Sequence, residues 1–302
     1  MYNNTTKNRT VGSFIGLAIG DALGASVEFM PRDSFEPVSG MRSGGPWQLK
    51  AGQWTDDTIM ALCLAESLVN RRSLDHNDVM NKWIAWYRDG YNSPKGYCFD
   101  IGATTASSLS HYEKNGSPVK GTNPRAGGNG SIMRLAPAAI VGHRSIDLAI
   151  SLSKTQGFLT HNSKDADDCC AILASCLYRA FNGFDPFVLN SSNGLSPAAA
   201  EIATGSYMDK SRTSIRSGGY CLDTLEAALW ACYNTSSFAD AVLAAVNLGD
   251  DADSVGAVAG QLAGAMYGFS GIPVKWFEQL YRKDDLISIA DELHEIGATI
   301  NV

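Results

Sequence analysis

Residues 249–268 read GDDADSVGAVAGQLAGAMYG, an acidic cluster followed by an apolar segment. Every fourth position of the apolar segment is a glycine, at Gly256, Gly260, Gly264 and Gly268. On a helix these glycines share one face, at a cost of about 1 kcal/mol each relative to alanine. The spacing therefore predicts a helix over 254–268 with a bare stripe that another helix can approach closely.

The same stripe occurs near the start of the chain, in a helix predicted over 10–24. Its glycines are again four residues apart, at Gly12, Gly16, Gly20 and Gly24. Two helices with small faces pack unusually closely and bring their neighbouring loops together. The paired stripes indicate that the two ends of the chain meet.

A second acidic cluster lies at residues 54–58, where WTDDT leads into a helix predicted over 55–70. One interpretation of both clusters is helix capping, because such side chains satisfy free amides and suit the helix dipole. The dipole stabilises a carboxylate by only about 0.3 to 1 kcal/mol. If the clusters converge, two carboxylates about 4 Å apart repel by about 4 kcal/mol at an effective dielectric of about 20.

Divalent cations would offset such repulsion. Oxygen ligands with hydroxyl neighbours, and with neither Cys nor His in the clusters, suit Mg²⁺ or Mn²⁺ rather than Zn²⁺. Spacing alone does not establish that the clusters converge, so capping and metal binding both stay open at this point.

Length and composition limit the class of protein. The 302 residues carry a net charge of −7, with 45% hydrophobic and 18% charged residues. These values exclude a disordered chain and argue against a nucleic-acid surface. No linker is marked, so we expect a single domain over 1–302, acting as a monomer.

The sequence shows no recognisable targeting signal, and we expect a cytoplasmic protein. Residues 1–10 are polar and predict no signal peptide, and no segment reaches the length of a membrane span. The seven cysteines lie mostly in apolar helical patterns, where a free thiol behaves as a small hydrophobe. A reducing compartment is the simplest interpretation.

Helical periodicity dominates the chain, and runs with strict alternation are missing. The remaining predicted helices span 76–88, 102–114, 130–141, 145–156, 164–181, 196–205, 221–233, 236–247, 273–281 and 285–297. The fold class is therefore all-α.

Several loops carry candidate functional residues. Asp100 lies at a predicted helix start, where it is either an N-cap or a functional carboxylate. Residues 125–134 read RAGGNGSIMR, with three glycines in four positions that free backbone amides to face an anion. His161 and Tyr220 lie at loop-to-helix junctions, where each either contacts a ligand or packs.

Taken together, these stretches resemble the ADP-ribosylglycohydrolase family, which includes the dinitrogenase reductase-activating glycohydrolases. The resemblance covers nearly the whole chain and depends on the order and spacing of residues 16–24 with Glu28, 54–58, 100–102, 128–137, 160–161, 218–225 and 247–254. It implies a compact orthogonal bundle of helices with a binuclear Mg²⁺ or Mn²⁺ centre in a central cleft.

Carried over by position, the resemblance assigns three sets of residues. The metal ligands would be Thr55, Asp56, Asp57, Asp251, Asp253 and Ser254, the last replacing the threonine of many relatives. Glu28 and Asp100 would be carboxylates near the scissile bond, and either could be the acid-base group. The ADP-ribose contacts would be Gly127, Asn129, Gly130, Ser131, Met133, His161 and Tyr220, with Asn129, Gly130 and Ser131 at the diphosphate.

The implied activity is hydrolysis of the bond between ADP-ribose and a protein side chain. Two cations would hold the 2″ and 3″ hydroxyls of the ribose and a bridging water, and an oxocarbenium-like state would follow. Arginine is the expected acceptor, with serine-linked or O-acetyl-ADP-ribose as alternatives. A catalytically silent binding or crystallin-like protein is a further alternative, but retention of Glu28, Asp100 and every aspartate of the two clusters favours the enzyme.

Overall fold

The computed structural model describes residues 5–189 and 192–300, so the first four residues of the polar N-terminal stretch lie outside it. The helices are α1 (Thr6–Gly24), α2 (Asp56–Arg71), α3 (His76–Asp89), α4 (Ala103–Asn115), α5 (Ala136–Val141), α6 (Ile146–Phe158), α7 (Lys164–Phe181), α8 (Pro197–Ala203), α9 (Cys221–Tyr233), α10 (Phe238–Val246), α11 (Ala252–Tyr267), α12 (Val274–Gln279) and α13 (Lys283–Thr299). Short 3₁₀ helices are η1 (Asn129–Ser131), η2 (Arg212–Ser214) and η3 (Phe269–Gly271). No strand forms among these described residues, and the all-α prediction is confirmed.

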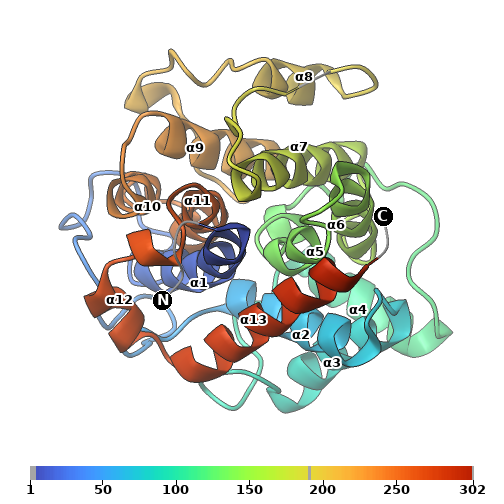
Figure 1. Ribbon diagram of the computed structural model, residues 1–302. Helices are drawn as coiled ribbons and strands as arrows, with labels where there is room; N and C mark the ends of the chain where they lie inside the picture. The colour runs from blue at the N-terminus through green and yellow to red at the C-terminus, as the bar shows by residue number, and fades with distance from the viewer. Residues whose placement is uncertain (1–4, 190–191, 301–302) are drawn as a thin grey trace.

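Helices α1 and α11 form an antiparallel central pair, with α7, α8 and α9 on one side and α2, α3 and α4 on the other (Figure 1). Their stripes pair Gly12 with Gly264, Gly16 with Gly260, Gly20 with Gly256, and Gly24 with Ala252. A Cβ built on Gly12 would lie 2.5 Å from the Gly264 carbonyl oxygen. The prediction that the striped helices meet is confirmed, except that Gly268 ends α11 with a φ of 73°.

Alanine at Gly260 is expected to lower the free energy of unfolding by about 2 kcal/mol or more. Its methyl group would collide with the Gly16 carbonyl and push the central helices apart, outweighing the gain of about 1 kcal/mol in helix propensity. Urea unfolding measures the change. Gly40→Ala is the control, since a Cβ there meets only the Trp276 indole nitrogen at 3.5 Å. Equal stability of the two variants would contradict the close packing.

The helix predicted over 130–141 is wrong. The chain forms η1 at Asn129–Ser131, turns, and starts α5 only at Ala136. Pro137 lies in the first turn of α5, because a proline inside a longer helix would lack its N–H and clash with the carbonyl four residues earlier. The break leaves Met133 and Arg134 between the two helices, facing the centre of the molecule.

Two further expectations concern the membrane and the thiols. Among the residues that the structure describes, no helix is both long enough and apolar enough to cross a membrane. The seven cysteines are free, and all except Cys98 are buried. They pack as small hydrophobic side chains, in agreement with the sequence.

Candidate active site

The N-termini of α2 and α11 meet, and this junction brings the two acidic clusters together. Thr55 Oγ1 lies 3.2 Å from Asp253 Oδ2, although the two residues are 198 positions apart. Ser254 Oγ lies 3.4 Å from Asp57 Oδ2. The convergence that the metal hypothesis requires is therefore present.

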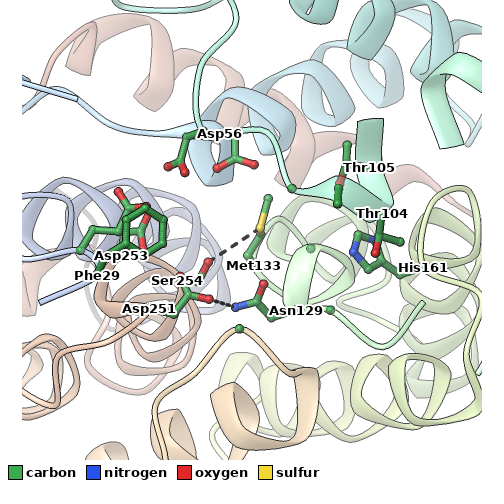
Figure 2. Close-up of a pocket in the computed structure, with 17 residues that line it drawn as sticks. Phe29, Asp56, Thr104, Thr105, Asn129, Met133, His161, Asp251, Asp253 and Ser254 are labelled. Carbon is green, nitrogen blue, oxygen red and sulfur yellow. Dashed lines mark hydrogen bonds between the residues drawn. The ribbon is translucent and has the colours of Figure 1, made fainter. Parts of the chain in front are cut away.

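A cavity of about 280 Å³ opens over this junction (Figure 2). The sequence-predicted residues that line it are Glu28, Asp56, Asp100, Asn129, Gly130, Met133, His161, Asp251, Asp253 and Ser254. Thr55 and Asp57 lie behind this lining, in contact with Asp253 and Ser254. Lining residues that the sequence did not single out are Phe29, Gly102, Ala103, Thr104, Thr105, Gly128 and Gly219.

Helix α2 is capped by Asp21, a residue of α1. The fully buried Asp21 carboxylate accepts the backbone N–H of Thr55 at 2.8 Å and that of Thr58 at 3.0 Å. The hydroxyls of the same two threonines donate to it at 3.0 and 2.6 Å. The N-cap residues Thr55 and Asp251 make no side-chain capping bond within the described chain, so the capping bonds that were expected of them do not form. Asp56, Asp57 and Asp253 do lie in first turns, where the helix dipole favours them.

Asp21 was missed because a cap supplied by another helix leaves no local pattern. The available signal was an acid inside the otherwise apolar run of α1. Burial raises the pKa of Asp21 to about 6, and the hydrogen bonds from Thr58 and Thr55 oppose that shift. The carboxylate is therefore a buried anchor for the start of α2, where the first cluster lies.

Asparagine at Asp21 is expected to lower the free energy of unfolding by about 3 kcal/mol. Its amide nitrogen would face donors and leave buried N–H or O–H groups unpaired, and the start of α2 would shift. Urea denaturation measures the loss. Asp285→Asn is the control, because that side chain is 58% exposed in its ion pair with Arg282, and such pairs contribute at most about 1 kcal/mol. A loss no larger than the control's would contradict the anchoring role.

The carboxylates at the junction have too few hydrogen-bond donors. The Thr55 hydroxyl carries one hydrogen, yet oxygens of Asp21, Asp57 and Asp253 lie between 3.0 and 3.3 Å from it. In the part of the chain that the structure describes, Asp57 Oδ1 and Asp253 Oδ1 are buried without any hydrogen-bond partner. Buried anionic oxygens in this state require a counter-charge.

When no cation is bound, these buried carboxylates tend to take up protons. Burial raises the pKa of Asp56, Asp57 and Asp253 well above the usual range, and the charges of neighbouring carboxylates raise it further. A hard divalent cation supplies the same compensation and prefers oxygen ligands of this kind. The donor set therefore fits Mg²⁺ or Mn²⁺.

Glu28 and Asp100 form a second carboxylate group at the rim. Glu28, Asp100 and Asp253 each bring one oxygen to within 4.8 Å of the others. The Trp47 indole N–H donates to Glu28 Oε2 at 2.8 Å and fixes its orientation. Burial raises the pKa of Glu28 to about 7, and burial with the charges of Asp56 and Glu28 raises that of Asp100 to about 12. The pair can hold a proton beside the cavity.

Three non-glycine residues around the cavity adopt left-handed backbone conformations, namely Phe29 (φ 63°), Asp100 (φ 61°) and Asp250 (φ 56°). The Phe29 N–H donates to the Asp250 carbonyl at 2.7 Å, and the Asp250 N–H donates to the Met30 carbonyl at 2.8 Å. Such strain concentrates at functional sites. Asp100 is not an N-cap, because Gly102 holds that position in α4, so the capping alternative for Asp100 is wrong.

Two glycines of the 125–134 loop leave room for aromatic rings that pack against the backbone. A Cβ on Gly130 would lie 2.5 Å from His161 Cε1, and a Cβ on Gly127 would lie 2.5 Å from Tyr220 Cε2. The Tyr220 hydroxyl donates to Asp165, outside the cavity lining. The sequence interpretation, amides freed for an anion, missed this packing because both rings come from distant segments.

The assignment of this loop to a diphosphate needs two corrections. The backbone N–H of Asn129 donates to the Gly219 carbonyl at 3.0 Å, and its side-chain amide donates to Asp251 Oδ2 at 2.7 Å. Ser131 is completely buried and does not line the cavity. Asn129 thus orients a carboxylate of the second cluster, and Ser131 lies behind the cavity lining with its hydroxyl unpaired among the described residues.

The wall across from the acids suits an anion. Gly102, Ala103, Thr104 and Thr105, the start of α4, line the cavity, and the first turn of α4 carries no acidic residue. The first amides of a helix lack intrahelical acceptors and attract negative groups. Figure 2 places Thr104 and Thr105 beside His161.

His161 is uncharged at this wall. Its Nδ1 lies 2.8 Å from the Thr160 hydroxyl, which accepts a hydrogen bond from Arg134 at 2.7 Å. Burial lowers the pKa of His161 to about 3, and the charge of Arg134 acts in the same direction. A neutral imidazole therefore faces the cavity over Gly128 and Gly130.

Comparison with known proteins places these features in a family. The model of the ADP-ribosylglycohydrolase family matches residues 2–300. Over 291 residues the chain is 47% identical to ADP-ribosylarginine hydrolase Tri1 of Pseudomonas putida, covering 95% of this chain and 78% of that protein. Over 290 residues it is 33% identical to the ADP-ribosyl-(dinitrogen reductase) glycohydrolase of Rhodospirillum rubrum, covering 94% of each. A solved structure, described as an ADP-ribosylglycohydrolase-related protein complex, matches with a TM-score of 0.87 at 37% identity, over 98% of this chain and 100% of that chain.

Proposed function

Because this chain belongs to the ADP-ribosylglycohydrolase family, we propose that its cavity hydrolyses the bond between ADP-ribose and an arginine side chain of a protein. The observation that carries the proposal is the junction of α2 and α11, where buried carboxylates converge without enough donors. The arginine acceptor is supported by the printed name of the Pseudomonas putida relative. Residues from both ends of the chain line one cavity, so we propose that 1–302 act as one catalytic domain.

We propose that two divalent cations, Mg²⁺ or Mn²⁺, complete the junction. The residues that would hold them are Thr55, Asp56, Asp57, Asp251, Asp253 and Ser254. When bound, the cations supply Lewis acidity and fixed points for the vicinal hydroxyls of the ribose. Asn129 holds Asp251 in place, and Asp21 holds Thr55.

The carboxylates at the rim carry the proton transfers. Water adds its oxygen to C1″ as the bond from C1″ to the guanidine nitrogen breaks, and the leaving nitrogen gains a proton. Glu28, oriented by Trp47 and adjacent to Asp100, is placed to take the proton of the water or to supply that of the leaving group. The positive charge that develops on the ribose is stabilised by the same carboxylates.

The ADP portion extends along the opposite wall. The diphosphate fits against the first amides of α4, next to Thr104 and Thr105. His161 is neutral there and adds no charge. The adenine end then lies toward Gly127 and Tyr220, beyond the glycine-rich loop.

Release of ADP-ribose from arginine-linked and serine-linked substrates tests the proposal. With Mg²⁺ we expect release from the arginine-linked substrate, loss of activity in EDTA, and recovery when Mg²⁺ is restored. Release from the serine-linked substrate alone would overturn the acceptor assignment. Release from neither would overturn the enzymatic proposal.

A further inference from the structure

A second hollow, of about 380 Å³, opens beside the catalytic cavity. Its lining residues are Phe29, Trp47, Asp100, Ile101 and Gly102. Phe29, Asp100 and Gly102 also line the catalytic cavity, so the two spaces are neighbours that share these residues as a common wall. The hollow therefore adjoins Asp100, and Gly102 separates it from the rest of the wall formed by the start of α4.

Phe29 lines this hollow with an exposed side chain and a left-handed backbone, both of which are unfavourable for phenylalanine. Its side chain is 63% exposed, and its backbone has a φ of 63°. Exposing an aromatic ring forgoes its burial free energy, and a left-handed phenylalanine is strained by about 1–2 kcal/mol. The paired hydrogen bonds with Asp250 and Met30 fix the backbone in this position. Figure 2 shows Phe29 at the opposite end of the view from His161.

Trp47 is the other aromatic residue that lines the hollow, and its position is also fixed. Its indole N–H donates to Glu28 Oε2 at 2.8 Å, and its ring packs on Phe99 with centroids 5.7 Å apart. Lys95 Nζ donates to the Trp47 carbonyl oxygen at 2.6 Å and holds the loop. These contacts set the position of the Trp47 ring, and the backbone hydrogen bonds set that of the Phe29 backbone.

The linings of the cavity and of the hollow differ in chemistry, although Asp100 and Gly102 belong to both. The start of α4 suits an anion, whereas the hollow presents aromatic rings beside Glu28 and Asp100. A planar delocalised cation matches the hollow, because a guanidinium stacks on aromatic faces and donates to carboxylates. We propose that the hollow binds the guanidinium of the leaving arginine, with Phe29 as a specificity-determining residue.

This inference depends on the proposed arginine hydrolysis, and steady-state kinetics on an arginine-linked substrate tests it. Phe29→Ala is expected to raise KM about tenfold, the size of a partly desolvated cation–π contact, with kcat changed less than about threefold. Phe29→Tyr keeps the ring face and is expected to keep the wild-type KM. The Kd of free ADP-ribose, which has no acceptor, is expected to stay within about twofold in both variants and reports that the site is folded.

Inhibition by small molecules that resemble the arginine side chain tests whether the hollow recognises the charge of the guanidinium or only its shape. Agmatine, which carries the guanidinium, is expected to inhibit the wild type about tenfold better than carbamoylputrescine, which has the same terminal ammonium but an uncharged ureido group in place of the guanidinium. Phe29→Ala is expected to lose that difference. Phe184→Ala is the matched control, because Phe184 is also an exposed phenylalanine, at 57%, and lines neither the cavity nor the hollow. It is expected to behave as the wild type.

The possible results distinguish the two proposals. Wild-type protein that releases no ADP-ribose from arginine overturns the proposed function, and the guanidinium site with it. Wild-type activity on arginine, combined with unchanged KM and unchanged agmatine inhibition in Phe29→Ala, overturns the guanidinium site alone.

Discussion

Replacing Asp253 by asparagine is expected to abolish hydrolysis while leaving the metal-free protein at least as stable as the wild type. Asp253 Oδ1 is buried without a partner among the described residues, and Oδ2 shares the single Thr55 hydrogen with two other carboxylates. Two carboxylates about 4 Å apart repel by about 4 kcal/mol at an effective dielectric of about 20. Without a cation, Asp253 either keeps that repulsion or takes up a proton at a cost set by its raised pKa. A neutral isostere removes this cost, and its effect on stability is therefore opposite in sign to that of most core substitutions.

The loss of rate is expected to exceed about 100-fold, because residues that merely orient metal ligands already cost 10- to 100-fold when changed. Turnover of the arginine-linked substrate at saturating Mg²⁺ measures it, and urea unfolding in EDTA measures stability. Asp285→Asn, on the exposed side of α13, is the control for the change of charge. A rate within about tenfold of wild type, or a metal-free variant that unfolds more easily, would contradict this role of Asp253.

Glutamine at Glu28 is expected to cut turnover by about 100-fold or more with Mg²⁺ binding retained. Its amide oxygen still accepts the Trp47 N–H, so the orientation survives, but the side chain no longer carries a proton. Single-turnover rates at saturating metal and substrate measure the effect, and calorimetry measures Mg²⁺ binding. A rate within about threefold of wild type would show that Glu28 is not the acid-base group. Loss of Mg²⁺ binding would instead make Glu28 a ligand, consistent with its oxygen near Asp253.

The Asp100→Asn variant separates the two rim carboxylates. Asp100 has a φ of 61°, a conformation that asparagine tolerates well, and it caps no helix. Its substitution is therefore expected to lower turnover without lowering stability. Thermal unfolding of the metal-free variant measures that stability, and a large loss would indicate a structural role for Asp100.

Periodicity was sufficient for the fold class and for most helices, because a helix that buries one face repeats its apolar residues locally. The glycine stripes of α1 and α11 also predicted a long-range contact, since close packing leaves a regular mark on both partners. The break before α5 was missed although its cause, Pro137, is visible in the sequence.

The sequence predicted those parts of the site whose residues are adjacent in the chain, but it did not establish which of these parts meet in space. The two clusters stand out as runs of acids, but their meeting at 3.2 Å between Thr55 and Asp253 is a property of the packed helices. Asp21 caps α2 from another helix, and the rings that pack on the glycine-rich loop also come from distant segments. No local sequence pattern predicts either contact. Phe29 resembles any aromatic residue in a turn until its exposure and backbone conformation are known.

Calorimetric titration of the metal-free protein with Mg²⁺, followed by ADP-ribose, tests the central claim most directly. We expect the wild type to bind two Mg²⁺ per chain and to bind ADP-ribose at least tenfold more tightly once they are present, since the ribose hydroxyls then have fixed partners. We expect Asp253→Asn to lose both effects. Equal ADP-ribose affinity with and without Mg²⁺, or unchanged Mg²⁺ binding by Asp253→Asn, would contradict a metal centre at the junction of α2 and α11.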